Sequence, residues 1–174
     1  MNHLWEKYRS LGIEGSLIGL EQGEIAVPYF CYPVGARAIG FEGCILYCFL
    51  PEYGEMVFAA NPESCADRYV YPLAKDFHDF LRLILACGSA NPVEQIVWMD
   101  REQFESHLQE ELAVQTEEQK AVLKRLAEEL ELSPMEDPFT AVRRIQADFD
   151  DGRIRYPDEY YDVLGMKRNG PANL

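Results

Sequence analysis

The sequence has little positive charge. It contains 16 Lys and Arg residues against 30 Asp and Glu residues, and its formal net charge is −14 over 174 residues. Proteins that bind nucleic acids neutralise phosphates with clustered Lys and Arg side chains. Because the sequence has no such cluster, we expect no nucleic-acid partner.

Long apolar segments are also missing. Residues 1–7 lack the basic start and the apolar run of a secretory signal. The longest apolar runs, 44–51 and 83–87, are far shorter than the ~20 residues that span a bilayer. We therefore expect a cytoplasmic protein without a membrane partner.

Cysteines are few, odd in number and irregularly spaced, with five in the chain, which fits a reducing compartment. Cys44 and Cys48 would face the same side of a strand. A zinc site, however, needs further ligands at similar spacing, and the three histidines are far apart in the sequence: His3, His78 and His107. The pattern favours buried thiols that pack as small apolar groups, and we expect no metal.

Motifs for catalysis or cofactor binding are absent from the sequence. The glycines between residues 12 and 23 do not follow a strand and open a helix, so they form no phosphate loop. Residues 148–152, together with Glu159, resemble a calcium loop. Gly152 nevertheless falls at position 5, where the turn needs glycine at position 6, and Arg155 occupies an apolar position. We predict no catalytic residue and no cofactor.

The chain does have the material for a folded core. Hydrophobic residues make up 48% and aromatic residues 12% of the sequence, which excludes general disorder, and the length suits one domain. Four segments are rich in β-forming residues: 24–32, 44–50, 55–60 and 68–71. Pro28 restricts the first to an edge or a broken strand, residues 51–54 join the next two as a hairpin, and Pro72 should end the last. Because both hairpin arms are apolar on both faces, the hairpin should lie centrally, with helices on at least one side.

Helical periodicity dominates the rest of the chain. We predict helices at 1–12, 76–88, 100–114, 117–132, 138–149 and near 156–161, and a frayed tail at 167–174. Asp76 is a predicted N-cap, Gly88 a predicted end, and Asp100 with Gln103 a predicted capping box. Strands followed by helices indicate an α+β fold with a mainly antiparallel sheet packed by helices and an added C-terminal helical segment.

The acidic residues have two interpretations. Residues 1–99 hold 12 acids and 6 bases (net −6), and residues 100–174 hold 18 acids and 10 bases (net −8). Paired acids are typical of solvated helix faces, but they could also steer a basic partner into contact. At the predicted hairpin tip, Tyr53 lies between Glu52 and Glu55. Since tyrosine is favoured at interfaces, we predict these three residues as an exposed partner-binding site.

Residues 54–64 and 69–85 carry a family resemblance. A strand, a Pro-Leu-Ala link at 72–74 and a helix with Phe77, Phe80 and Leu81 resemble the closing part of SUKH-superfamily domains, over roughly residues 30–112. That superfamily includes regulators of fungal cell-wall glucan synthesis and many bacterial immunity proteins. The resemblance implies a helix packed on an antiparallel-rich sheet and no shared catalytic residues. It divides the chain into a SUKH-like domain, 1–114, and a helical extension packed on it, 115–174.

These observations lead to three functional hypotheses. The favoured one is a non-enzymatic protein-binding domain, in its most concrete form a bacterial immunity protein that neutralises a cognate toxin such as a basic nuclease. The second is a regulatory scaffold for cell-wall or envelope synthesis. The third is an enzyme whose site is assembled from dispersed residues, with His78, Asp79 and Cys87 as candidates. The sequence predicts no oligomeric state.

Overall fold

A four-stranded antiparallel sheet forms the centre of the protein, which a computed structural model describes for residues 2–167. The strands are β1 (Arg37–Glu42), β2 (Ile45–Phe49), β3 (Val57–Ala60) and β4 (Val70–Ala74), and they lie side by side in chain order. A short 3₁₀ helix, η2 (Pro51–Tyr53), begins the connection between β2 and β3. The α+β fold predicted from the sequence is confirmed.

The two central strands are buried on both faces. Every residue of β2 and β3 is buried, and successive side chains point to opposite sides of the sheet. Tyr47, Phe49 and Ala59 belong to one apolar core, whereas Cys48 and Phe58 belong to the other. Both faces of the sheet therefore need a cover.

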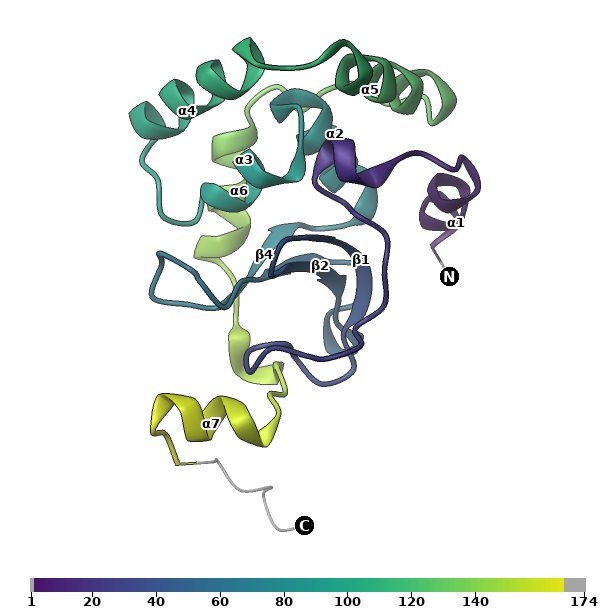
Figure 1. Cartoon of the computed structure of the whole chain (residues 1–174). Helices are drawn as coiled ribbons and strands as arrows, with labels where there is room; N and C mark the ends of the chain where they lie inside the picture. Colours follow the sequence, from purple (N-terminus) through teal and green to yellow (C-terminus); the bar gives the residue numbers. More distant parts are fainter. Residues whose placement is uncertain (1, 168–174) are drawn as a thin grey trace.

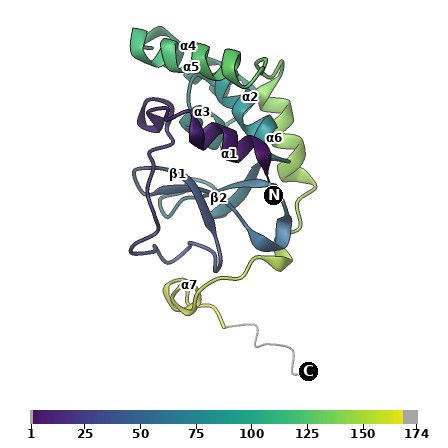
Figure 2. The ribbon, with the colours of Figure 1, turned by 90° about the vertical axis from the view of Figure 1, so that its right-hand side faces the viewer.

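Helices cover the first face (Figures 1 and 2). They are α1 (His3–Ser10), the 3₁₀ helix η1 (Gly15–Ile18), α2 (Phe77–Cys87), α3 (Ala90–Gln95), α4 (Arg101–Ala113), α5 (Glu117–Glu129) and α6 (Pro138–Ala147). The ring of Phe77 on α2 lies 5.2 Å from that of Trp5 and 6.1 Å from that of Phe49, measured between centroids. The apolar stripe of α2 thus joins α1 to the sheet, while α4 and α5 form an outer layer.

The second face is covered by a loop and by the C-terminal part of the described chain. Cys31 and Tyr32 from the loop and Ile154 from the segment after α6 enter this core. That segment contains η3 (Asp151–Arg153) and α7 (Asp158–Leu164), and Figure 2 places α7 on the side of the sheet opposite the helices. The Val34 N–H donates to the Arg155 carbonyl over 2.7 Å, which ties the two covering segments together.

The helix boundaries follow the capping signals in the sequence. The Asp76 side chain accepts from the Asp79 N–H over 2.8 Å, and Gly88 ends α2 with φ +85°. Asp100 and Gln103 form the predicted capping box at the start of α4. These predictions are confirmed because each depends on local backbone groups.

One predicted strand and the predicted end of another were wrong. Residues 24–32 form no strand: Val27 is 85% exposed, and no ladder forms around Pro28. Strand β4 passes through Pro72, which an edge strand tolerates because one side of its backbone needs no ladder partner. Strand β1 and helix α3 were not predicted. The predicted frayed tail lies, except for Lys167, outside the described residues.

Within residues 2–167, no helix combines the length and the apolar character required to cross a bilayer.

We expect Gln146→Ala to destabilise the protein, because this side chain fixes α6 on the edge of the sheet. The buried Gln146 Nε2 donates to the Pro72 carbonyl over 3.1 Å. Losing one partner of a buried hydrogen bond costs about 1–3 kcal/mol. Urea unfolding should show a lower midpoint with an unchanged slope. Gln109→Ala, at an exposed position of α4, is the control, and an equal effect of the two changes would contradict the assignment.

Candidate functional site

The predicted site at the β2–β3 connection is only partly exposed. Tyr53 is only 8% exposed, so the expectation that it is exposed was wrong. Its hydroxyl donates to the Asp150 carbonyl over 2.8 Å and accepts from the Arg153 N–H over 3.1 Å. Glu52 forms an ion pair with Arg155 at 2.8 Å, and Glu55 is exposed. Sequence periodicity could not show this because the C-terminal segment that covers Tyr53 lies about 100 residues further along the chain.

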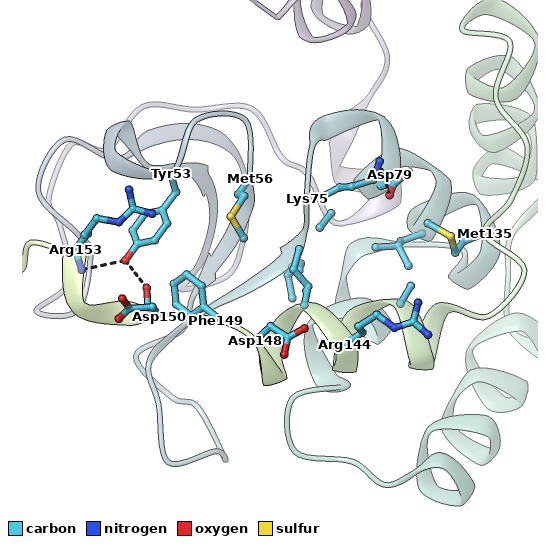
Figure 3. A pocket seen from close by; sticks show the side chains of 15 residues that line it. Tyr53, Met56, Lys75, Asp79, Met135, Arg144, Asp148, Phe149, Asp150 and Arg153 are labelled. Carbon is cyan, nitrogen blue, oxygen red and sulfur yellow. Dashed lines mark hydrogen bonds and ion pairs between the residues drawn. The ribbon is translucent and has the colours of Figure 1, made fainter.

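A groove of about 560 Å³ begins beside Tyr53 (Figure 3). It runs between the β3–β4 side of the sheet, α2 and α6, and its floor is apolar, with Met56, Leu73, Leu83, Ile145 and Phe149 among its residues. Figure 3 shows Tyr53 and Arg153 at one end, Met135 at the other, and Phe149 and Met56 between them.

The groove exists because the chain leaves α6 and crosses to the other face of the sheet. Helix α6 ends at Ala147. Phe149, two residues further on, turns its ring toward the second core. The Phe149 ring lies 5.2 Å from that of Tyr53 and 5.4 Å from that of Phe58. Arg153 then places its guanidinium 4.6 Å from the Tyr53 ring centroid, a cation–π contact.

Charged side chains of both signs form the rim of the groove. Lys75 pairs with Asp79 at 3.5 Å. Arg144, Asp148 and Arg153 are exposed, and in the described part of the chain none of them has an ion-pair partner within 4.0 Å. The groove can therefore accept apolar side chains on its floor and charged groups at its rim.

A second site lies under α3, where the helix brings a carboxylate to the sheet. Glu94 is 1% exposed. It accepts hydrogen bonds from Asn61 Nδ2 at 3.0 Å, from the Tyr71 hydroxyl and from the Gln95 side chain. A buried carboxylate without such donors would be very costly, so these three bonds allow Glu94 to occupy the interface between α3 and the sheet.

Glu42, at the end of β1, is the second carboxylate of this region. Gly19 has φ +75°, a conformation that favours glycine, and a Cβ there would also lie 2.4 Å from Glu42 Oε2. Burial raises the pKa of Glu42 to about 7; Asn91 opposes this shift, whereas Glu94 and Glu111 add to it. Within residues 2–167, the buried Oε1 atom of Glu42 has no hydrogen-bond partner.

Glu42 lines an opening of about 380 Å³, which we call the acidic pocket, whereas the buried Glu94 is not among the residues of its lining. Its lining comes from the β1–β2 turn, the end of β3 and α3: Glu42, Gly43, Cys44, Ile45, Asn61, Glu63, Asn91 and Gln95. No Lys or Arg of the described chain is among these residues. The sequence prediction missed this pocket, although one signal was present, since Glu94 interrupts an otherwise apolar helix face between Val93 and Ile96.

The structure does not assemble the dispersed enzyme candidates into one site. His78 is exposed at the start of α2, whereas Cys87 is buried at its end, nine positions further along the helix and about 13 Å away. Burial raises the pKa of the Cys87 thiol to about 12, which suppresses the thiolate needed for nucleophilic attack.

One group in the described chain has the spacing to hold a metal ion: Asp76, His78 and Asp79. Lys75 pairs with both carboxylates, and Arg82 pairs with Asp79, each at 3.5 Å. These cations already neutralise the acids and oppose a further positive charge. We assign no metal to this group.

Comparison with known proteins adds no relative. The chain matches no protein-family model, no curated protein and no solved structure.

We expect the Glu42 carboxyl to make stability depend on pH. Its folded-state pKa of about 7 lies above the ordinary value of 4.5, so the folded state holds a proton that the unfolded state releases. The contribution of the protonated carboxyl to the free energy of unfolding is fully present below pH 4.5 and is lost as the pH rises through about 7. Between pH 5 and pH 8, the unmodified protein should lose on the order of 2 kcal/mol of its free energy of unfolding through Glu42. Glu42→Gln should abolish this loss.

Urea unfolding of both proteins at the two pH values measures this difference. Glu129→Gln, on the exposed face of α5, controls for the loss of one negative charge. The same pH dependence in Glu42→Gln and in the unmodified protein would show that Glu42 is ionised throughout.

Tyr53→Phe tests the attachment of the C-terminal segment at the groove. The change removes the hydroxyl that bonds both Asp150 and Arg153, and we expect a loss of about 1–2 kcal/mol. Tyr29→Phe, at an exposed tyrosine, serves as the control. Hydrogen exchange should increase selectively in residues 149–155, and uniform exchange in the variant would contradict this role.

Proposed function

We propose that the chain is a non-enzymatic domain that binds another protein through the groove of Figure 3. The observation that carries this proposal is the composition of the groove: an apolar floor, with Met56 and Phe149, inside a rim that includes the exposed charges of Arg144 and Asp148. An apolar centre with a polar rim is typical of protein–protein interfaces.

Methionine side chains favour an adaptable contact. Met56 and Met135 line different parts of the groove, and unbranched, polarisable thioethers fit irregular apolar surfaces. The Arg153 guanidinium rests on the Tyr53 ring, as the 4.6 Å centroid distance indicates. Arginine and tyrosine together are enriched among the residues that dominate binding energies.

The net charge of −14 favours a basic partner. The excess of acids attracts such a partner over distances up to the Debye length and orients it before contact. Together with the resemblance of residues 30–112 to SUKH domains, this leads us to propose an immunity protein that acts in the cytoplasm and neutralises a cognate toxin, such as a basic nuclease.

Co-expression with the toxin encoded in the neighbouring gene tests this function. The chain should restore growth and bind the purified toxin, with an affinity that falls as salt rises. Ala141→Arg places a long charged side chain in the groove without removing a large apolar group. We expect it to weaken binding at least tenfold, a loss of about 1.4 kcal/mol or more.

Ala113→Arg makes the same change at an exposed position of α4 and should leave binding intact. Thermal unfolding of both variants separates lost binding from lost folding. Equal binding by Ala141→Arg and Ala113→Arg would exclude the groove, and failure of the unmodified chain to bind any neighbouring toxin would overturn the proposed function.

A further inference from the structure

A small pocket, which we call the arginine pocket, lies where α6 packs on the edge strand β4. It measures about 330 Å³, and its lining comes from β4, the segment before it, the turn after α3 and α6: Arg68, Tyr71, Val97, Arg143, Gln146 and Ala147. The three lining residues of α6 are spaced i, i+3 and i+4, so they share one face of the helix. The residues of α6 that line the groove, such as Ala141 and Ile145, lie on the opposite face. The arginine pocket is therefore separate from the groove.

The charge of the arginine pocket is opposite to that of the whole protein. Its lining contains Arg68 and Arg143, and no Asp or Glu of the described chain is among its residues. The chain as a whole has a net charge of −14. An acidic protein thus places two cations at one opening without a carboxylate in its lining.

Arg68 and Arg143 also differ from the other cations in burial. Within residues 2–167, they and Arg82 are partly buried, whereas every other Lys and Arg is exposed. Arg82 pairs with Asp79 at 3.5 Å, but in the same part of the chain Arg68 and Arg143 have no ion-pair partner within 4.0 Å. A charge loses hydration on burial, and an opposite charge compensates that loss. The two partly buried cations that lack this compensation share one pocket, which points to an anionic ligand.

Contacts within the fold position the donors of the pocket without neutralising them. The Arg143 guanidinium lies 5.3 Å from the centroid of the Phe139 ring, and its Nη2 donates to the Met99 carbonyl. Neither contact supplies a full negative charge. Gln146 is only 8% exposed, and its Nε2 donates to the Pro72 carbonyl over 3.1 Å, which leaves the second N–H of the amide for another acceptor.

We propose that the arginine pocket binds a phosphate group, either as free phosphate or as a small monoester. Guanidinium groups carry N–H donors in a planar fork that matches the oxygens of phosphate and carboxylate. A phosphate monoester carries about 1.5–2 negative charges at pH 7, so one group balances both arginines, whereas one carboxylate balances only one. The net charge of −14 opposes a polyanion such as a nucleic acid.

Titrations with sodium phosphate and with methyl phosphate test this site, at an ionic strength held constant with sodium chloride. The side-chain amide signals of Gln146 report binding by NMR, and we expect saturable shifts with a Kd on the order of 1 mM. Arg68→Gln should weaken binding at least tenfold. Arg68→Lys, which keeps the charge but loses the planar fork, should weaken it less. Arg68 is changed because Arg143 also bonds the Met99 carbonyl.

Arg37→Gln is the matched control. It removes an exposed arginine on β1, the opposite edge strand of the sheet, and should leave phosphate binding unchanged. Urea unfolding of each variant verifies that it is folded. The absence of saturable shifts, or equal binding by Arg68→Gln and Arg37→Gln, would overturn the site.

Acetate tests the kind of anion. Binding of acetate as tight as that of methyl phosphate would overturn the assignment of a phosphate group. Tighter binding of methyl phosphate than of inorganic phosphate would identify the ligand as a monoester, and the reverse order would identify it as free phosphate; both orders support the site. None of these results depends on whether the chain binds a toxin.

Discussion

The two-sided burial of β2 and β3 is the constraint on which the rest of the structure depends. Neither Tyr47 and Phe49 on one face nor Cys48 and Phe58 on the other can be left in water, since each large apolar side chain gains about 1.5–3 kcal/mol on burial. A meander of four short strands cannot cover itself. The chain therefore supplies a helical layer for one face and the loop with the C-terminal segment for the other.

Covering both faces forces the chain to pass the edge of the sheet, and the groove forms at that passage. Val142 of α6 belongs to the core of the helical face, whereas Ile154 belongs to the core of the opposite face. Between them, the Phe149 ring and the Tyr53 hydroxyl hold the crossing segment. The proposed binding surface is thus a consequence of how the second face is covered, which explains why residues distant in sequence line it.

The sequence predicted the features that depend on neighbouring residues. The Asp76 cap, the Asp100 capping box and the central hairpin each involve residues a few positions apart, and local rules describe them well. Tyr53 was placed on the surface because its cover comes from residues near 150. Strand β1 was missed because its interior contains Gly40 and an irregular register with β2. No local pattern places Glu42 beside Glu94, since only the packing of α3 on the sheet joins them.

Glu94 on α3 and Glu42 at the end of β1 are buried in different ways. Glu94 accepts from Asn61, Tyr71 and Gln95, so its charge is compensated within the fold and it orients the polar groups around it. Glu42 has Asn91 nearby but, in the described chain, one oxygen without a partner, and burial raises the pKa of its carboxyl. Further hydrogen-bond donors within the fold would have satisfied Glu42, in the way that Asn61, Tyr71 and Gln95 satisfy Glu94. In the described chain the unpartnered Oε1 atom of Glu42 is itself buried, so the fold leaves one acceptor unsatisfied where β1 meets α3.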